Sequence, residues 1–90
     1  MIQDIPQSNF NQIKGIVYEV VDHHEFPSVT LEVGNNSKRF VNFYIRKSYF
    51  TEVESILKLE NKVIVTFFIS SRHKHDRWYT TANILRVDMQ

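Results

Sequence analysis

Hydrophobic and polar residues alternate in two neighbouring segments, which predicts a pair of β-strands with one buried face. Residues 28–33 read Ser-Val-Thr-Leu-Glu-Val, and residues 38–45 read Lys-Arg-Phe-Val-Asn-Phe-Tyr-Ile. Val41 and Phe43 would face inward in the second segment, because successive side chains of a strand point to opposite faces. The Gly-Asn-Asn sequence at 34–36 tolerates positive φ at each position, so these two strands are expected to form a hairpin.

Three further segments are rich in β-branched and aromatic residues, and we expect each to form a strand: 13–21, 62–70 and 78–88. Gly15 lies inside the first of them, which indicates a bulge or a tight bend, as at a barrel corner. The last segment has no clean phase because Ile84 and Leu85 are adjacent. Either a bulge separates these two side chains, or both faces of that strand are covered.

Residues 48–59 have a different pattern, with apolar side chains at helical spacing at Phe50, Val53 and Leu57. Ser48 is the expected N-cap of this helix. The chain therefore reads as three strands, one short helix and two strands. This is the element order of an all-β, five-stranded OB-fold Greek-key barrel, in which the helix lies between strands 3 and 4. An open antiparallel sheet packed on one helix is the alternative.

The length of 90 residues predicts one domain over 13–90, preceded by a polar, flexible N-terminal arm at 1–12. Cysteine is absent, which excludes disulfides and a thiolate metal site. No apolar run is long enough to span a membrane, and the N-terminus lacks the pattern of a secretory signal. We therefore expect a cytoplasmic protein without a membrane partner.

The net charge is only +1, but its distribution is uneven. Cations gather in two segments, 38–47 and 72–77, whereas most acidic residues lie elsewhere. A nearly neutral protein can present a basic stripe in this way. A solvated surface of mixed charges is the alternative interpretation.

The segment 71–81 reads Ser-Ser-Arg-His-Lys-His-Asp-Arg-Trp-Tyr-Thr and interleaves cations with aromatic rings. Cations neutralise phosphates and rings stack on bases, so this composition fits a single-stranded nucleic acid. OB-folds bind ligands on strands 2 and 3 and on the loop between strands 4 and 5, where both basic segments would fall. We expect the nucleic-acid-binding residues to be Lys38, Arg39, Phe40, Tyr44, Arg46, Arg72, His73, Lys74, His75, Arg77, Trp78 and Tyr79.

Outward-facing rings have a second explanation, because large apolar side chains on a barrel surface can instead form a small second core or a dimer interface. This applies to Phe40, Tyr44, Phe68 and Trp78, and most strongly to Phe68. The sequence leaves open whether Trp78 faces a groove or the core.

No catalytic motif is present, so we expect a protein that is not an enzyme and that needs no cofactor. The serines lie outside any nucleophile-elbow sequence, and two glycines are too few for a phosphate-binding loop. The pairs His23–His24 and His73–His75 lack a recognisable metal-ligand spacing, so no metal site is expected.

The segment Lys62-Val63-Ile64-Val65-Thr66-Phe67, followed by Ser70-Ser71-Arg72 and by Arg77-Trp78-Tyr79-Thr80-Thr81, resembles the OB-fold single-stranded DNA-binding proteins of bacteria and their phages. Gly15-Ile16-Val17 also fits the start of that family. The resemblance covers about residues 13–88, and it assigns roles by motif to Arg77, Trp78 and Tyr79 alone. Bacterial members end in an acidic tail, whereas this sequence ends at Gln90, so recruitment of partners by a tail is not expected.

The resemblance implies sequence-independent binding of single-stranded DNA in replication, recombination or repair, by a homo-oligomer. Two alternatives stay open from the sequence. RNA is one, because no residue can be assigned to a 2′-hydroxyl contact. The other is a protein-interaction or accessory subunit, for example in a primosome-like assembly, that uses its exposed rings as an interface.

Overall fold

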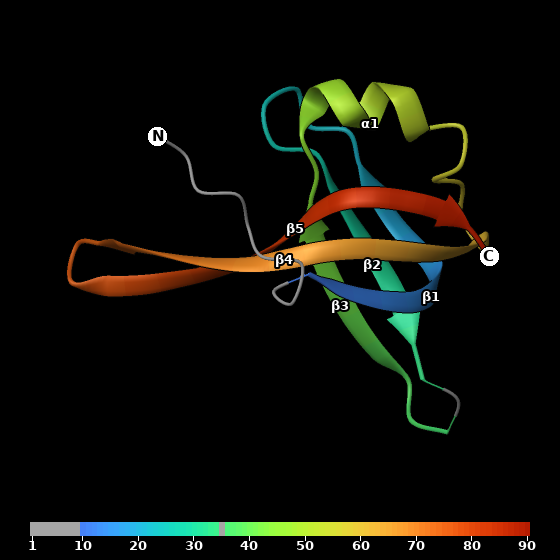
Figure 1. The fold of residues 1–90 in the computed structure, drawn as a ribbon, viewed down its shortest axis with the longest axis horizontal. Helices are drawn as coiled ribbons and strands as arrows, with labels where there is room; N and C mark the ends of the chain where they lie inside the picture. The colour runs from blue at the N-terminus through green and yellow to red at the C-terminus, as the bar shows by residue number, and fades with distance from the viewer. Residues whose placement is uncertain (1–9, 35) are drawn as a thin grey trace.

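The computed structural model describes residues 10–34 and 36–90, which form a closed barrel of five β-strands with one short helix (Figure 1). The elements are β1 (Asn11–Val21), β2 (Ser28–Val33), β3 (Arg39–Tyr44), α1 (Lys47–Val53), β4 (Lys62–Lys74) and β5 (Arg77–Met89). Around the barrel the strands follow the order β1-β2-β3-β5-β4. The expected OB-fold barrel is confirmed, and the open-sheet alternative is wrong.

The barrel closes because β1 is shared between two neighbours. Its first half pairs with β4 up to Ile16, and its second half pairs with β2 from Ile16 onward. A Cβ atom on Gly15 would lie 2.9 Å from Val33 Cγ1 and 3.0 Å from the carbonyl oxygen of Glu32, so glycine fits this close approach without displacing its neighbours. The bulge that the sequence indicated in this strand lies at Tyr18 instead.

The strand patterns predict the core well. Val29 and Leu31 of β2 and Phe43 of β3 are buried, whereas Phe40 and Tyr44 point outward, as the alternation of β3 predicts. Positive φ at Gly34 is also found at the start of the β2–β3 connection. The buried apolar core consists of Val17, Val29, Leu31, Phe43, Ile45, Phe50, Val53, Leu57, Val63, Val65, Ile84 and Val87.

Helix α1 covers one end of the barrel and is shorter than expected (Figure 1). The N-cap position is Arg46, whose side chain makes no capping hydrogen bond, so the expected cap at Ser48 is wrong. After Val53 the chain turns tightly, and the N–H groups of Ile56 and Leu57 both donate to the Val53 carbonyl, at 2.8 and 3.1 Å. A continuous helix and a short helix followed by such a turn would bury the same apolar positions. The spacing of apolar residues alone therefore overestimated the length of the helix.

The largest difference from expectation is at the connection between β4 and β5. These strands do not end at Ser70 and Trp78 but continue to Lys74 and Arg77, joined by the two residues His75 and Asp76. Beyond the barrel they form a two-stranded ribbon that projects into solvent (Figure 1). We call residues 68–83 the β4–β5 arm.

The turn at the tip of the arm explains why two residues suffice. His75 has a φ of 53° and Asp76 a φ of 61°. Positive φ at both central residues is the property of a type I′ turn, whose twist matches that of the flanking strands. The expected loop at 71–77 is therefore the end of a two-stranded hairpin.

A bulge at Leu85 resolves the unclear phase of β5. Thr66 pairs with Arg86 and Phe67 pairs with Ile84, so Leu85 has no partner in β4. Ile84 can therefore be buried while the adjacent Leu85 is only half-buried. Of the two explanations that the sequence left open, the bulge is the correct one.

The expected N-terminal arm at 1–12 overlaps the first strand, because Asn11 and Gln12 already belong to β1. Residues 1–9 lie outside the described residues. Within the described chain, no helix is long and apolar enough to cross a membrane.

Candidate nucleic-acid interface

The β4–β5 arm separates the predicted binding residues into two faces, because cross-strand partners in a ribbon share a face. Arg72 pairs with Tyr79 and Lys74 pairs with Arg77, so these four side chains form one side. We call it the basic face. The opposite side, which we call the tryptophan face, contains Ile69, Ser71, His73, Trp78, Thr80 and Ala82.

The basic face presents positive charge that is not neutralised locally. Arg72, Lys74 and Arg77 are exposed, and none of them forms an ion pair with a carboxylate in residues 10–34 and 36–90. The adjacent Tyr79 ring is 47% exposed. This combination of free cations and an accessible ring suits the phosphates and bases of one strand.

On the tryptophan face, Trp78 is 70% exposed, so it does not enter the core. The imidazole of His73 stacks on its indole, with ring centroids 4.8 Å apart and an interplanar angle of 26°. One side of the indole therefore contacts His73, and the other side is open to a further flat group. The sequence placed Trp78 and the cations in one cluster, but the strand geometry directs them to opposite sides.

Polar side chains link β4 and β5 by hydrogen bonds at the root of the arm. Asn83 Nδ2 lies 3.0 Å from Ser70 Oγ and 3.1 Å from Thr81 Oγ1, and it donates within this group. On the other face the hydroxyl groups of Ser71 and Thr80 are 2.8 Å apart and bonded. Cross-strand bonds of this kind hold the two strands in register where the barrel no longer supports them.

The outward face of β3 meets the arm at its root. Tyr44 pairs with Asn83 of β5, the position at which β3 and β5 join, and Asn83 in turn pairs with the half-buried Phe68 of β4. Phe40 lies on the same face of β3, with Asn42 between the two rings. Phe40 is 53% exposed and Tyr44 is 45% exposed. The exposed surface that these two rings form therefore extends from the barrel wall toward the basic face.

Tyr18 is a ring that the sequence did not single out. Its centroid lies 4.6 Å from that of Phe40, at an interplanar angle of 55°. The bulge in β1 brings it there. The burial of β1 shows the effect of this bulge, because Val17 and the half-buried Val20 both pack on the core at a spacing of three, which an unbroken strand does not allow.

Three predicted cations near β3 are placed less favourably. Lys38 Nζ lies 3.8 Å from a carboxylate oxygen of Glu32, which offsets part of its charge. Arg39 shares the strand side of Val41 and Phe43, so it extends from the end of the barrel rather than from the outward face. Arg46 is exposed at the start of α1, past the end of β3.

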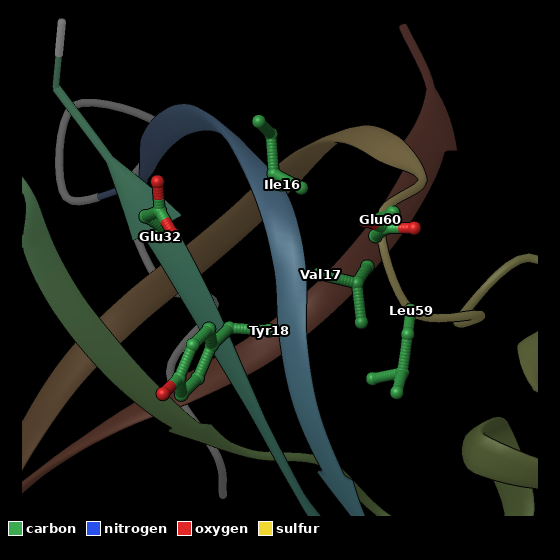
Figure 2. A pocket seen from close by; sticks show the side chains of 6 residues that line it. All are labelled: Ile16, Val17, Tyr18, Glu32, Leu59 and Glu60. Carbon is green, nitrogen blue, oxygen red and sulfur yellow. The ribbon is translucent and has the colours of Figure 1, made fainter.

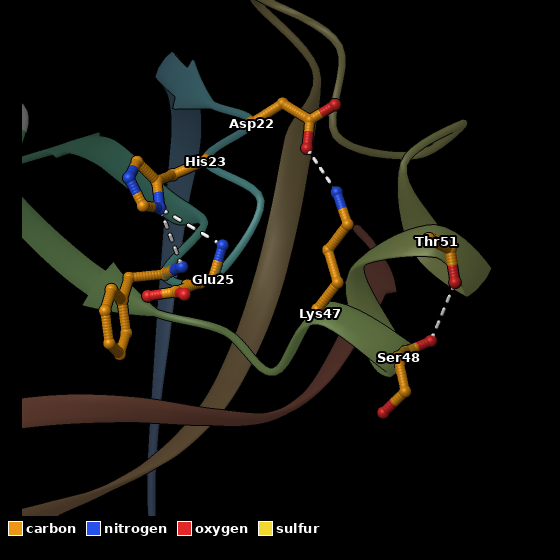
Figure 3. A network of polar contacts seen from close by, with 7 residues as sticks. Asp22, His23, Glu25, Lys47, Ser48 and Thr51 are labelled. Carbon is orange, nitrogen blue, oxygen red and sulfur yellow. Dashed lines mark hydrogen bonds and ion pairs between the residues drawn. The ribbon is translucent and has the colours of Figure 1, made fainter.

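The β1–β2 loop, which flanks the ligand face of an OB-fold, is held by local polar contacts (Figure 3). Asp22 Oδ1 accepts a 2.7 Å bond from Lys47 Nζ at the start of α1. His23 Nδ1 accepts from the backbone N–H groups of Glu25 and Phe26, at 3.1 and 3.0 Å. This loop is thus ordered, but it adds carboxylates rather than cations to the surface.

A depression on the β1 side of the barrel adjoins the outward face of β3, because one of its lining residues, Tyr18, packs on Phe40. Its walls are formed by Ile16, Val17, Tyr18, Glu32, Leu59 and Glu60 (Figure 2). Two carboxylates with no cation among the lining residues disfavour a phosphate polymer. Elsewhere in the described residues, no three His, Asp or Glu side chains lie close enough together to hold a metal ion.

No protein-family model and no curated protein sequence matches this chain. Solved structures of other proteins, in contrast, have a similar fold. The mitochondrial single-stranded DNA-binding protein Rim1 of S. cerevisiae has a TM-score of 0.69 at 9% identity, over 89% of this chain and 92% of that one. The N-terminal domain of PriB from Thermoanaerobacter tencongensis, described as dimeric, has a TM-score of 0.70 at 17% identity, over 93% and 98%.

A third similar structure is the small single-stranded DNA-binding protein of Streptomyces coelicolor. Its TM-score is 0.56 at 13% identity, over 90% of this chain and 93% of that one. At such low identities the likeness establishes the arrangement of the strands and not the activity. This chain therefore has the fold of these three solved structures, the five-stranded OB-fold barrel.

Proposed function

We propose that this protein is a non-catalytic, cytoplasmic protein that binds single-stranded DNA with little sequence preference during replication, recombination or repair. The observation that carries the proposal is the basic face of the arm, where Arg72, Lys74 and Arg77 surround Tyr79 without a neutralising carboxylate. Two of the similar structures are described as single-stranded DNA-binding proteins, which supports the same function.

Each chemical feature of the surface has a part in this function. The arm cations neutralise phosphates, which gives affinity without reading the sequence. Rings at Phe40 and Tyr44 on the barrel and at Tyr79 on the arm stack on bases, which is also tolerant of sequence. Trp78, on the far side of the arm, offers a stacking surface to a strand that wraps over the tip.

Fluorescence titration tests the proposal directly, because Trp78 is the single tryptophan of the chain. Its emission should change on addition of oligo-dT, and the affinity should fall as salt rises. Absence of binding at low salt, or binding without salt dependence, would contradict the proposed function. Oligo-dT should also bind more tightly than duplex DNA, whose bases are not available for stacking.

An RNA oligonucleotide of the same length distinguishes the nucleic-acid class. Equal affinity for oligo-U and oligo-dT would extend the function to single strands in general, since phosphate contacts and stacking do not use the 2′-hydroxyl. Tighter binding of oligo-U would replace DNA by RNA as the ligand.

We further propose that the protein acts as a homo-oligomer. The dimeric PriB domain, whose fold this chain shares over most of its length, supports this proposal. Sedimentation velocity with and without oligo-dT would measure the state. A subunit interface that covers Phe40 over about 1,000 Å² or more would assign this ring to assembly rather than to stacking.

A further inference from the structure

The two histidines of the arm lie among four charged side chains: Arg72, Lys74, Asp76 and Arg77. His73 is on the tryptophan face, between the Ser71–Thr80 hydroxyl pair and the tip of the arm. The opposite side of the ribbon carries the cations Arg72, Lys74 and Arg77 and the phenol of Tyr79. At the tip, His75 is adjacent to Asp76, the single carboxylate of the arm.

A phosphate polymer bound to the arm changes this balance of charge. Each nucleotide brings one negative charge, and a negative charge within about 4–6 Å favours the protonated form of an imidazole. Exposed imidazoles in general gain or lose their proton between about pH 5 and pH 8. Binding of the polymer and protonation of the arm histidines are then linked, so each promotes the other.

The contact between His73 and Trp78 makes this link specific to the arm. The two rings are stacked at 4.8 Å, so a proton on His73 places a cation against the indole. A cation over an indole face is attracted to it, so the stack is retained when His73 becomes charged. The other side of the indole, which belongs to a side chain that is 70% exposed, stays available to a base.

Resting on the proposed function, we propose that the arm takes up protons when it binds single-stranded DNA, mainly at His73 and secondarily at His75. In this respect the arm differs from a permanently charged surface. Its affinity for the polymer rises as pH falls, and it is lowest where both imidazoles are neutral. Arg72, Lys74 and Arg77 supply the basal affinity at every pH.

The test is the dissociation constant of a dye-labelled oligo-dT, measured by anisotropy between about pH 6 and pH 8.5 at constant ionic strength. Oligo-dT has no group that titrates in this range, so a change in affinity comes from the protein. The wild-type constant should fall about 3- to 10-fold from pH 8 to pH 6, within the limit of about tenfold per pH unit for one coupled proton. Calorimetry in two buffers of different ionisation enthalpy should show proton uptake on binding.

Substitutions at three histidines, His73, His75 and His24, assign the effect. His73→Gln should lose most of the pH dependence, so that the ratio of its dissociation constants at pH 8 and pH 6 approaches one whatever its affinity at pH 8. His73→Arg should bind at every pH about as tightly as the wild type at pH 6, which keeps the inference testable if glutamine disturbs the stack. His24→Gln is the matched control, because His24 is an exposed imidazole in the β1–β2 loop, with its Nε2 3.5 Å from a carboxylate oxygen of Glu25.

The outcomes separate this inference from the proposed function. Failure to bind oligo-dT at any pH contradicts the proposed function itself. Binding with a flat pH profile, or a profile that His73→Gln and His75→Gln together leave unchanged, overturns only the proton uptake.

Discussion

Tyr44 of β3 lies opposite Asn83 of β5, in the parallel pair where the barrel wall meets the root of the projecting arm. Because Asn83 also donates hydrogen bonds to Ser70 and Thr81, this backbone pairing connects β3 to the root of the arm. The outward face of β3 and the basic face of the arm are therefore parts of one continuous surface. The proposed binding of a single strand depends on this continuity.

The length of this surface predicts how many nucleotides the protein covers. The distance from Arg77 to Asn83 along β5 is about 20 Å, and that from Tyr44 to Phe40 along β3 is about 13 Å, at about 3.3 Å per residue. A strand that follows both, at about 3.4 Å per nucleotide when stacked and more when extended, occupies about 5 to 10 nucleotides. Titration with oligo-dT of increasing length should show affinity levelling off in this range. Full affinity for a trinucleotide would argue that only one of the two faces binds.

The stacking role of Trp78 predicts a large loss on truncation. Trp78→Ala should weaken oligo-dT binding about 5- to 100-fold, because one stacked base contributes about 1–3 kcal/mol. Anisotropy of labelled DNA measures it, since the variant has no tryptophan. Leu59→Ala is the control, because Leu59 is 63% exposed and lines the acidic depression rather than the arm. Equal effects of the two substitutions would rule out stacking on Trp78.

The basic face predicts the salt dependence of binding. Arg72→Gln and Arg77→Gln should each reduce the slope of log affinity against log salt by about 0.7, the value for one phosphate contact on a single strand. Lys58→Gln removes a charge from the connection after α1 and should leave the slope unchanged. If Lys58→Gln reduced the slope as much as Arg72→Gln does, the net charge of the protein, and not the arm, would attract the polymer.

The tip of the arm predicts a stabilising substitution. Asp76 adopts a φ of 61°, a left-handed conformation that glycine reaches without the steric cost of a Cβ atom. Asp76→Gly should therefore increase amide hydrogen-exchange protection in the arm, whereas Asp76→Ala should reduce it. Equal protection in both variants would show that the turn does not limit the stability of the arm.

The close approach of β2 to Gly15 predicts a destabilising substitution. A Cβ atom there would lie 3.0 Å from a backbone oxygen that cannot move without disturbing β2, so Gly15→Ala should lower the free energy of unfolding by about 1–3 kcal/mol. Urea denaturation measures this value. Lys14→Ala, at the neighbouring exposed position of β1, is the control and should cost far less. Similar losses would indicate that strand propensity, and not the contact with β2, determines the effect.

The sequence predicts the barrel well wherever a strand has one buried and one exposed side. Val29, Leu31 and Phe43 alternate with polar or outward residues because their two environments differ. The segment 71–74 lacks this contrast, because both sides of a projecting ribbon face solvent. Its run of polar residues is therefore typical of a loop. The type I′ turn at His75 and Asp76 could not be predicted either, because asparagine and glycine are the residues that usually indicate such a turn.

The sequence predicts which residue types gather in the candidate site, but not how the strands direct them. Arg39 follows Lys38 and precedes Phe40 in the chain, yet strand alternation directs it to the other side of β3. Trp78 follows Arg77 in the same way and faces away from it. Tyr18 reaches Phe40 only because of a bulge, which changes which side chains meet without changing the order of residues.

The uninterrupted register between the Leu85 bulge and the tip has a consequence for related proteins with arms of other lengths. Deletion of one cross-strand pair, such as Ser71 with Thr80, would reverse the orientation of every residue beyond it, and the cations would then share a side with Ile69. Deletion of two successive pairs would shorten the reach by about 7 Å and restore the original orientation. Functional arms of this kind should therefore differ in length by even numbers of pairs.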